Sequence, residues 1–215
     1  MSINKPVPFL FLIIIAFACH EKKERPAPID NVPVDTTATT QSQPLPPVNG
    51  SAYVSVDISP MDMSYFPVDY PKLKMASSTI APPVARVIYS RPHLQKRHLF
   101  HDLLKYDEPW RLGANEATEI DFYRQVTIQG KKVSPGRYVI YCIPHADNWS
   151  IVLNSNIDSW GLHQDSTKDI HKFEIPVTTN NPVQEYYTML FEKTDTGASL
   201  MIAWDAVVAK LPITF

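Results

Sequence analysis

Short runs of alternating apolar and polar residues, separated by turn residues, fill the chain from about residue 51 to its end. Alternation with a period of two is typical of antiparallel strands that bury one face. The 20 prolines disfavour long helices, because each proline lacks a backbone donor. Strands are predicted over residues 84–90, 118–128, 137–143, 149–153, 172–177, 185–193, 199–204 and 208–213. This pattern predicts an all-β fold, a single antiparallel β-sandwich of the jelly-roll type.

Three segments depart from simple alternation. Leu99 and Leu103 belong to a helically spaced apolar set, which predicts one short helix over residues 97–106, packed against the sandwich. Residues 186–191 are apolar on both faces, which predicts a central strand covered on both sides. The aromatic residues between 53 and 70 lie among prolines, and this segment is predicted to wrap the sandwich and cover an edge.

The N-terminal residues have the organisation of an export signal. Lys5 precedes an apolar run over residues 8–18 that is too short to cross a bilayer core of about 30 Å as a helix. The small residues before Cys19 resemble the lipobox of bacterial lipoproteins, although Leu is commoner where Ala16 stands. Residues 1–18 are therefore predicted to be a lipoprotein signal peptide and Cys19 to be acylated. An ordinary signal peptide with an incidental cysteine is the alternative.

The residues after Cys19 have the composition of a tether. Residues 20–50 contain no Phe, Tyr or Trp, and they combine several prolines with a stretch rich in Thr, Ser and Gln. Such a segment cannot bury enough apolar surface to fold. We therefore expect a disordered tether over residues 19–50 and one folded domain over 51–215. An acylated Cys19 would hold the domain at a membrane of the cell envelope, as an outer-membrane lipoprotein facing the periplasm or the cell surface.

Charge and cysteine content restrict the possible partners and bonds. Lys and Arg number 20 against 22 Asp and Glu, so the chain has no one-signed field that would favour nucleic acid as a partner. With Cys19 acylated, Cys142 is the only remaining thiol, and no disulfide can form within the chain. Cys142 lies in an apolar strand-like run and is predicted to be a small buried side chain.

Several segments resemble the bacterial domain-of-unknown-function family 2911. They are residues 88–92, 108–118 (Glu-Pro-Trp-Arg-Leu-Gly-Ala-Asn-Glu-Ala-Thr), 136–138 and 149–154. Residues 59–67 and 159–161 are similar to members from Bacteroidetes. The resemblance covers roughly residues 55–215 and implies an exported protein with a β-rich fold. It implies no established activity.

The best candidate site combines Arg91, Trp110, Arg111, Asn115 and Glu116. A guanidinium can hold a carboxylate or phosphate through two hydrogen bonds, and an indole offers a flat face to a sugar or ring. A glutamate beside an arginine can act as an acid or base. These residues are therefore predicted to bind a ligand.

A structural role is the alternative for the same residues. In it, Gly113 and Asn115 form a tight left-handed loop, and Arg111 pairs with Glu116 to fix that loop in place. A partly apolar pocket with an unpaired Glu116 would favour an enzyme, and a buried, fully paired cluster would favour a scaffold.

His93, His98 and His101 lie close together in the sequence and can in principle share a zinc or copper ion. Exposed histidines account for the same residues, and neither a metal nor a cofactor is predicted. A carbohydrate-binding surface is a further alternative for the aromatic residues of the strands, although core packing is favoured for them. They are Tyr138, Tyr141, Trp149, Trp160, Tyr186, Tyr187 and Trp204.

The sequence predicts an exported, lipid-anchored envelope protein of uncharacterised activity whose sandwich binds a ligand or partner. The expected partners, besides the membrane, are a glycan, a small anion or an envelope protein. The common motifs of hydrolases, zinc enzymes and nucleotide-binding enzymes are absent from the sequence, so an enzyme is not favoured. Two alternatives remain open: an enzyme that acts on an anionic or carbohydrate substrate through the Arg and Glu residues, and a structural component of the envelope.

Overall fold

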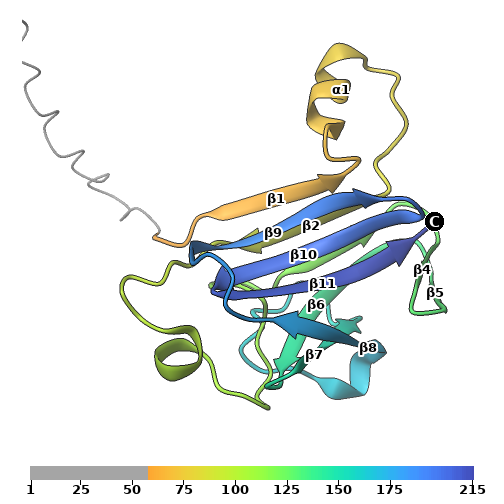
Figure 1. Ribbon diagram of the computed structural model, residues 1–215. Coiled ribbons are helices and arrows are strands. Elements are labelled where there is room, and N and C mark those ends of the chain that lie inside the picture. Colours follow the sequence, from red (N-terminus) through yellow and green to blue (C-terminus); the bar gives the residue numbers. More distant parts are fainter. Residues whose placement is uncertain (1–57) are drawn as a thin grey trace, which may run out of the picture. The chain divides into compact units, whose positions relative to one another are not determined.

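The computed structural model describes residues 58–215 (Figure 1). The predicted signal peptide, Cys19, the tether and residues 51–57 lie outside the described residues. The strands are β1 (Met61–Phe66), β2 (Ala85–Ser90), β3 (Glu119–Phe122), β4 (Val126–Ile128), β5 (Lys131–Val133), β6 (Gly136–Pro144), β7 (Asn148–Asn154), β8 (Asp169–Thr178), β9 (Gln184–Thr194), β10 (Gly197–Asp205) and β11 (Val207–Thr214). Three short helical segments accompany them: α1 (Tyr70–Ala76), η1 (Leu99–Leu103) and η2 (Ser166–Lys168). The predicted all-β class with a short helix is confirmed.

The described strands form one antiparallel sheet in the order β1-β2-β3-β6-β7-β8-β11-β10-β9, with the hairpin β4–β5 attached to β11. The sheet curls into a nearly closed barrel, which brings its two end strands together (Figure 1). At this seam the Phe191 N–H of β9 donates to Ser64 Oγ of β1 over 3.3 Å. The chain just after β2 pairs with β9, because the Tyr187 N–H donates to the Pro92 carbonyl over 2.8 Å. The two predicted layers are therefore opposite sides of one continuous sheet.

Period-two burial produces the core inside this barrel. Along β11, for example, Ala209, Leu211 and Ile213 point inward and are at most 1% exposed, whereas the residues between them are exposed. The other long strands contribute alternate residues in the same way, and these side chains form one continuous apolar cluster. Burial of this apolar surface is the main force that holds the barrel together.

Three local predictions need refinement. The strand predicted over residues 118–128 is two strands, β3 and β4, which pair with different neighbours. The helix predicted over 97–106 is the five-residue π-helix η1, which buries Leu99 against the core. The edge-covering segment before the first predicted strand contains β1, which pairs with β2.

The prediction that residues 186–191 form a central strand is wrong. β9 is an end strand of the sheet, and Tyr186 on its outer face is 50% exposed. The strands with buried residues on both faces are β6, β7 and β10. On the outer face of β6, Tyr141 is buried and its hydroxyl donates to Asp169.

Cys142 is fully buried in β6, as predicted. Burial raises the pKa of its thiol well above the usual value, and the nearby charge of Glu174 acts in the same direction. The thiol is therefore protonated and unreactive at neutral pH. Among residues 58–215 there is no helix with the length and apolar character needed to span a membrane.

Candidate functional site

Trp110 is fixed at one end of the barrel by a backbone pairing with β6. Its N–H donates to the Cys142 carbonyl over 2.7 Å, and the Cys142 N–H donates back to the Trp110 carbonyl over 2.9 Å. β3 pairs with β6 only as far as Val139, so Trp110 occupies the next free stretch of that strand's edge. The pairing turns the indole toward the barrel interior, where it is 8% exposed.

An aromatic cluster closes this end of the barrel beneath the Trp110 ring. The Trp110 ring stacks on Trp204, with 5.8 Å between ring centroids and 21° between the planes. It meets Tyr187 and Trp149 edge to face, at centroid distances of 5.1 and 6.0 Å. The indole N–H donates to the Gly113 carbonyl over 3.3 Å, which satisfies its one polar atom. The cluster forms the floor of a pocket.

The loop over residues 111–118 folds tightly against its neighbours. Leu112 and Asn115 have left-handed backbones, with φ of 55° and 59°. The Thr118 hydroxyl donates to the Leu112 carbonyl over 2.6 Å. A Cβ on Gly113 would lie 3.0 Å from the Ser90 carbonyl oxygen, so this glycine allows a close backbone approach. The left-handed turn expected at Asn115 is present, but its second left-handed residue is Leu112 and not Gly113.

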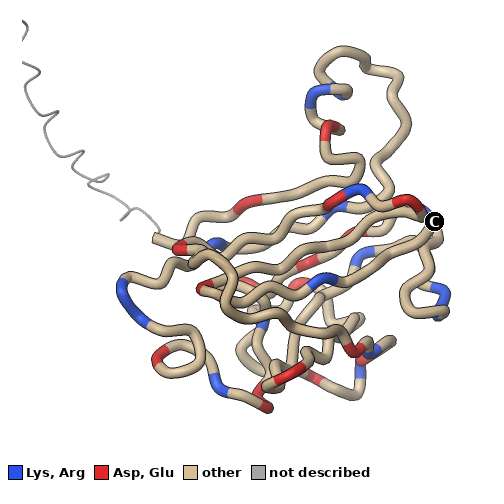
Figure 2. Tube along the Cα trace, viewed as in Figure 1, with Lys and Arg blue, Asp and Glu red and all other residues tan. Residues whose placement is uncertain are grey.

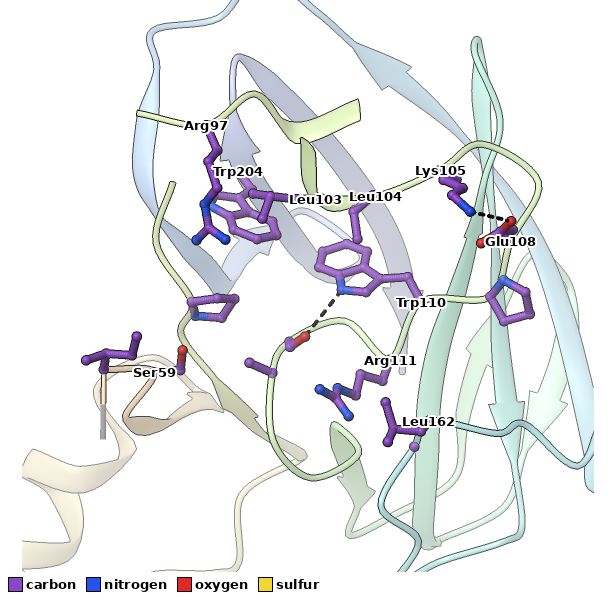
Figure 3. Close-up of a pocket in the computed structure, with 16 residues that line it drawn as sticks. Ser59, Arg97, Leu103, Leu104, Lys105, Glu108, Trp110, Arg111, Leu162 and Trp204 are labelled. Carbon is purple, nitrogen blue, oxygen red and sulfur yellow. Dashed lines mark hydrogen bonds and ion pairs between the residues drawn. The ribbon is translucent and has the colours of Figure 1, made fainter. Parts of the chain in front are cut away.

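The pocket above the aromatic cluster has a volume of about 510 Å³, within the range usual for small-molecule sites. We call it the barrel-end pocket. Its walls come from segments that are far apart in the sequence: Ile58, Ser59, Pro92, Arg97, Leu103, Leu104, Lys105, Glu108, Pro109, Trp110, Arg111, Gly113, Ala114, Gly161, Leu162 and Trp204. Figure 3 shows the Trp110 and Trp204 rings inside it, with Arg97 and Arg111 reaching it from different elements.

The charged groups of the barrel-end pocket are mostly cationic. Lys105 and Glu108 lie 3.5 Å apart and pair with each other. Arg97 donates to the backbone carbonyls of His93 and Leu94 and forms no ion pair with any described residue.

Arg111 is the least satisfied of these cations. Its one hydrogen bond within the described chain is a long contact of 3.5 Å to the Trp160 carbonyl. Burial lowers the pKa of its guanidinium, and the charge of Glu116 opposes that change. No described carboxylate lies within ion-pair distance of Arg111, so the predicted pair with Glu116 is not formed in this structure. A partly desolvated guanidinium with no carboxylate in ion-pair contact favours an anion.

The structure divides the five predicted site residues into two groups. Trp110 and Arg111 line the barrel-end pocket, whereas Arg91, Asn115 and Glu116 do not. Arg91 binds the seam of the barrel: it pairs with Asp62 over 3.2 Å and donates to the Tyr187 carbonyl.

The other two residues of the second group lie beside the pocket. Asn115 donates to the carbonyl of Ser59, a residue of the pocket wall. Glu116 is exposed.

The three histidines of the metal alternative have different surroundings. His93 stacks on Tyr186 at a centroid distance of 5.2 Å and lies 3.7 Å from Glu185. His101 contacts Asp102, whose carboxylate accepts the His98 N–H at the start of η1. Across residues 58–215 there is no group of three or more His, Cys, Asp or Glu side chains arranged to hold a metal ion.

Sequence reasoning missed Arg97 and Lys105 as pocket residues. Both lie within the short helix predicted over residues 97–106, which lies in the chain between Arg91 and Trp110. That position in the sequence could have indicated that the segment covers the pocket, because a segment between two parts of a site often covers the site. The pairing of Arg97 with backbone carbonyls had no signal in the sequence.

A series of hydrogen-bonded side chains, which the sequence did not predict, fixes the loop that carries Lys105 and Glu108. Asp107 contacts Nδ1 of His145, and Nε2 of His145 lies 3.1 Å from the Ser150 hydroxyl. This order resembles that of a catalytic triad. Ser150, however, is fully buried and its hydroxyl donates to Glu174 over 2.6 Å. These hydrogen-bonded side chains therefore connect the loop that carries Lys105 and Glu108 to β7 and β8.

Comparisons with known proteins gave one match. The model of the family described as "Protein of unknown function (DUF2911)" matches residues 72–213. No curated protein and no solved structure matches the chain.

The close packing of the pocket wall can be tested at Gly161. Its φ is +79°, and an added Cβ would lie 3.0 Å from the Cα of Ala117 and 3.1 Å from the Cβ of Arg111. Gly161→Ala should therefore lower the free energy of unfolding by about 2–4 kcal/mol, from backbone strain plus steric overlap.

Gly130→Ala is the matched control for this substitution. Gly130 has a φ of +76° but no atom within 4 Å of the added Cβ, so only the strain of about 1–2 kcal/mol is expected. Urea unfolding of both variants measures the difference. Equal losses would contradict the close contact between Gly161 and the loop over residues 111–118.

Proposed function

Since the chain belongs to the DUF2911 family, whose activity is not established, we propose a function from the site itself. The protein is an exported, lipid-anchored envelope protein, and its barrel-end pocket binds a small anionic ligand. Arg111 supports this proposal more than any other residue. Its guanidinium lines a pocket beside two indole rings, and within residues 58–215 it has no carboxylate partner.

The walls of the pocket indicate what the ligand carries besides its charge. Trp110 and Trp204 provide flat aromatic faces, and Leu103, Leu104 and Leu162 provide aliphatic surface. A sugar or aromatic ring packs well on such faces. The ligand is therefore a small anion with a flat or apolar body, such as a sugar phosphate or an aromatic carboxylate.

The positions of the carboxylates favour binding over catalysis. The enzymatic alternative assigns the acid or base role to Glu116, which is exposed and does not line the pocket. The glutamate that does line it, Glu108, pairs with Lys105 at the rim. A binding role requires only the cations and the aromatic floor, which are all in place.

Export and anchoring rest on the N-terminal sequence. The apolar run over residues 8–18 ends at Cys19, and the residues between Cys19 and the described domain have the composition of a tether. The membrane facing an envelope compartment is the proposed location.

Ligand binding can be tested with inorganic phosphate, glucose 6-phosphate and benzoate. At a concentration of about 100 Kd, a bound probe stabilises the folded state by about 2.7 kcal/mol, which raises Tm by roughly 5–10 °C in a domain of this size. Arg111→Ala should abolish the increase for the probe that binds. Differential scanning fluorimetry measures the ligand-induced change in Tm.

Arg124→Ala is the matched control, since Arg124 does not line the barrel-end pocket and lies over the Phe215 ring instead. It should keep the ligand-induced increase. If none of the probes stabilises the protein, or if both arginine variants lose the same stabilisation, the assignment of Arg111 as the anion-binding residue is wrong.

Anchoring can be tested separately with Cys19→Ser. The wild-type chain should partition into the membrane fraction and carry acyl groups on Cys19, whereas the variant should carry none and lose stable attachment. Cell fractionation and mass spectrometry of the N-terminal peptide provide the measurement. An unmodified Cys19 in the wild-type protein would contradict the anchor and leave the pocket proposal untouched.

A further inference from the structure

A second, larger pocket lies at the opposite end of the barrel, where β1 and β9 end and β10 begins. It has a volume of about 780 Å³. One wall is the segment over residues 67–84 that joins β1 to β2 and contains α1; we call this segment the arm. Figure 1 shows α1 standing away from the sheet. The pocket, named here the arm pocket, is lined by Phe66, Pro67, Val68, Asp69, Lys72, Lys193, Thr194, Asp195, Thr196, Gly197 and Phe215.

The inner surface of the arm pocket is apolar and open to water. The rings of Phe66 and Phe215 form it, with centroids 5.1 Å apart. Phe215 is 42% exposed and Val68, on the facing wall, is 58% exposed. Large apolar side chains gathered in an exposed hollow usually mark a binding site.

The arm is not fixed by the core. None of the residues of α1 is buried, and Met75 is 89% exposed. Hydrogen bonds hold the arm mainly at its ends, where the Val84 N–H donates to the Phe66 carbonyl over 2.8 Å. A seven-residue helix is marginal in water without a packing partner. An occupant of the arm pocket would supply apolar surface for this wall to pack against.

The rim of the arm pocket carries both signs of charge. Lys72 and Lys193 line it together with Asp69 and Asp195. No ion pair or side-chain hydrogen bond joins any of these four groups to another described residue. Figure 2 shows both colours on the arm. Unpaired ammonium and carboxylate groups around one opening are complementary to a head group that carries a phosphate and an ammonium.

We propose that the arm pocket binds the alkyl chain of a zwitterionic amphiphile, with the chain against Phe66, Val68 and Phe215 and the head group at the charged rim. A free single-chain amphiphile and a bilayer phospholipid present the same chemistry. The arm pocket shares no residue with the barrel-end pocket. The inference therefore stands or fails independently of the anion-binding function.

The experiment measures binding of octyl, decyl and dodecyl phosphocholine to the full chain by calorimetry, at concentrations where the amphiphiles are monomeric. Each pair of added methylenes that enters the pocket should tighten binding by about 15-fold. Val68→Asp should weaken binding by about tenfold or more, because it places a charge in the apolar wall. Val68 is exposed, so this variant should still fold.

Val183→Asp is the matched control, because Val183 is 64% exposed and lines neither pocket. It should bind as the wild type does. The inference is overturned if the wild type shows no saturable binding, if chain length has no effect, or if both aspartate variants bind alike.

A head-group series and a two-chain lipid complete the test. Dodecyl sulfate and dodecyl trimethylammonium, which each carry one sign, should bind more weakly than dodecyl phosphocholine, and equal binding would overturn the assignment of the rim. Monomeric dihexanoyl phosphatidylcholine distinguishes the sources. Binding at least as tight as that of octyl phosphocholine supports a bilayer phospholipid, and weaker binding supports a free single-chain amphiphile.

Discussion

The two backbone hydrogen bonds between Trp110 and Cys142 are the constraint on which the proposed site depends. They hold a residue outside the regular strands against the exposed edge of β6, and this places the indole over Trp204 and Tyr187. Arg111 follows directly in the chain. Because the Trp110 backbone is fixed, its neighbour must lie at the pocket wall, where burial and the lack of a described carboxylate partner leave its charge available to a ligand.

The barrel therefore has two chemically different ends. At one end aromatic rings fill the interior, and two arginines without ion-pair partners among residues 58–215 lie above them. At the other end the partly exposed Phe215 ring packs on the buried Phe66 ring, below an arm that buries none of its helical residues. The long strands between these ends are packed by alternate apolar residues and carry no comparable pocket among those described. Both proposals thus follow from what the core leaves unsatisfied at its ends.

Local alternation predicted most strands because burial itself alternates, as along β11, where Ala209, Leu211 and Ile213 face the core. β1 lacked this signal, since only Phe66 of its residues is buried. The order of strands is a long-range property, which is why β9 was misplaced. Trp110 and Arg111, neighbours in one sequence motif, both line the pocket. Arg91, Asn115 and Glu116 do not line it, because nearness in the sequence does not determine the direction in which a side chain points.

The most direct test of this account is hydrogen exchange at the amides of Trp110 and Cys142. If their reciprocal hydrogen bonds fix the barrel end, both amides should be protected as strongly as those that pair β6 with β7, and should exchange only through an opening close to global unfolding in free energy. Exchange of the Trp110 amide as fast as that of the exposed Lys105 would contradict it. The indole would then be held only loosely, and the site would lack its fixed floor.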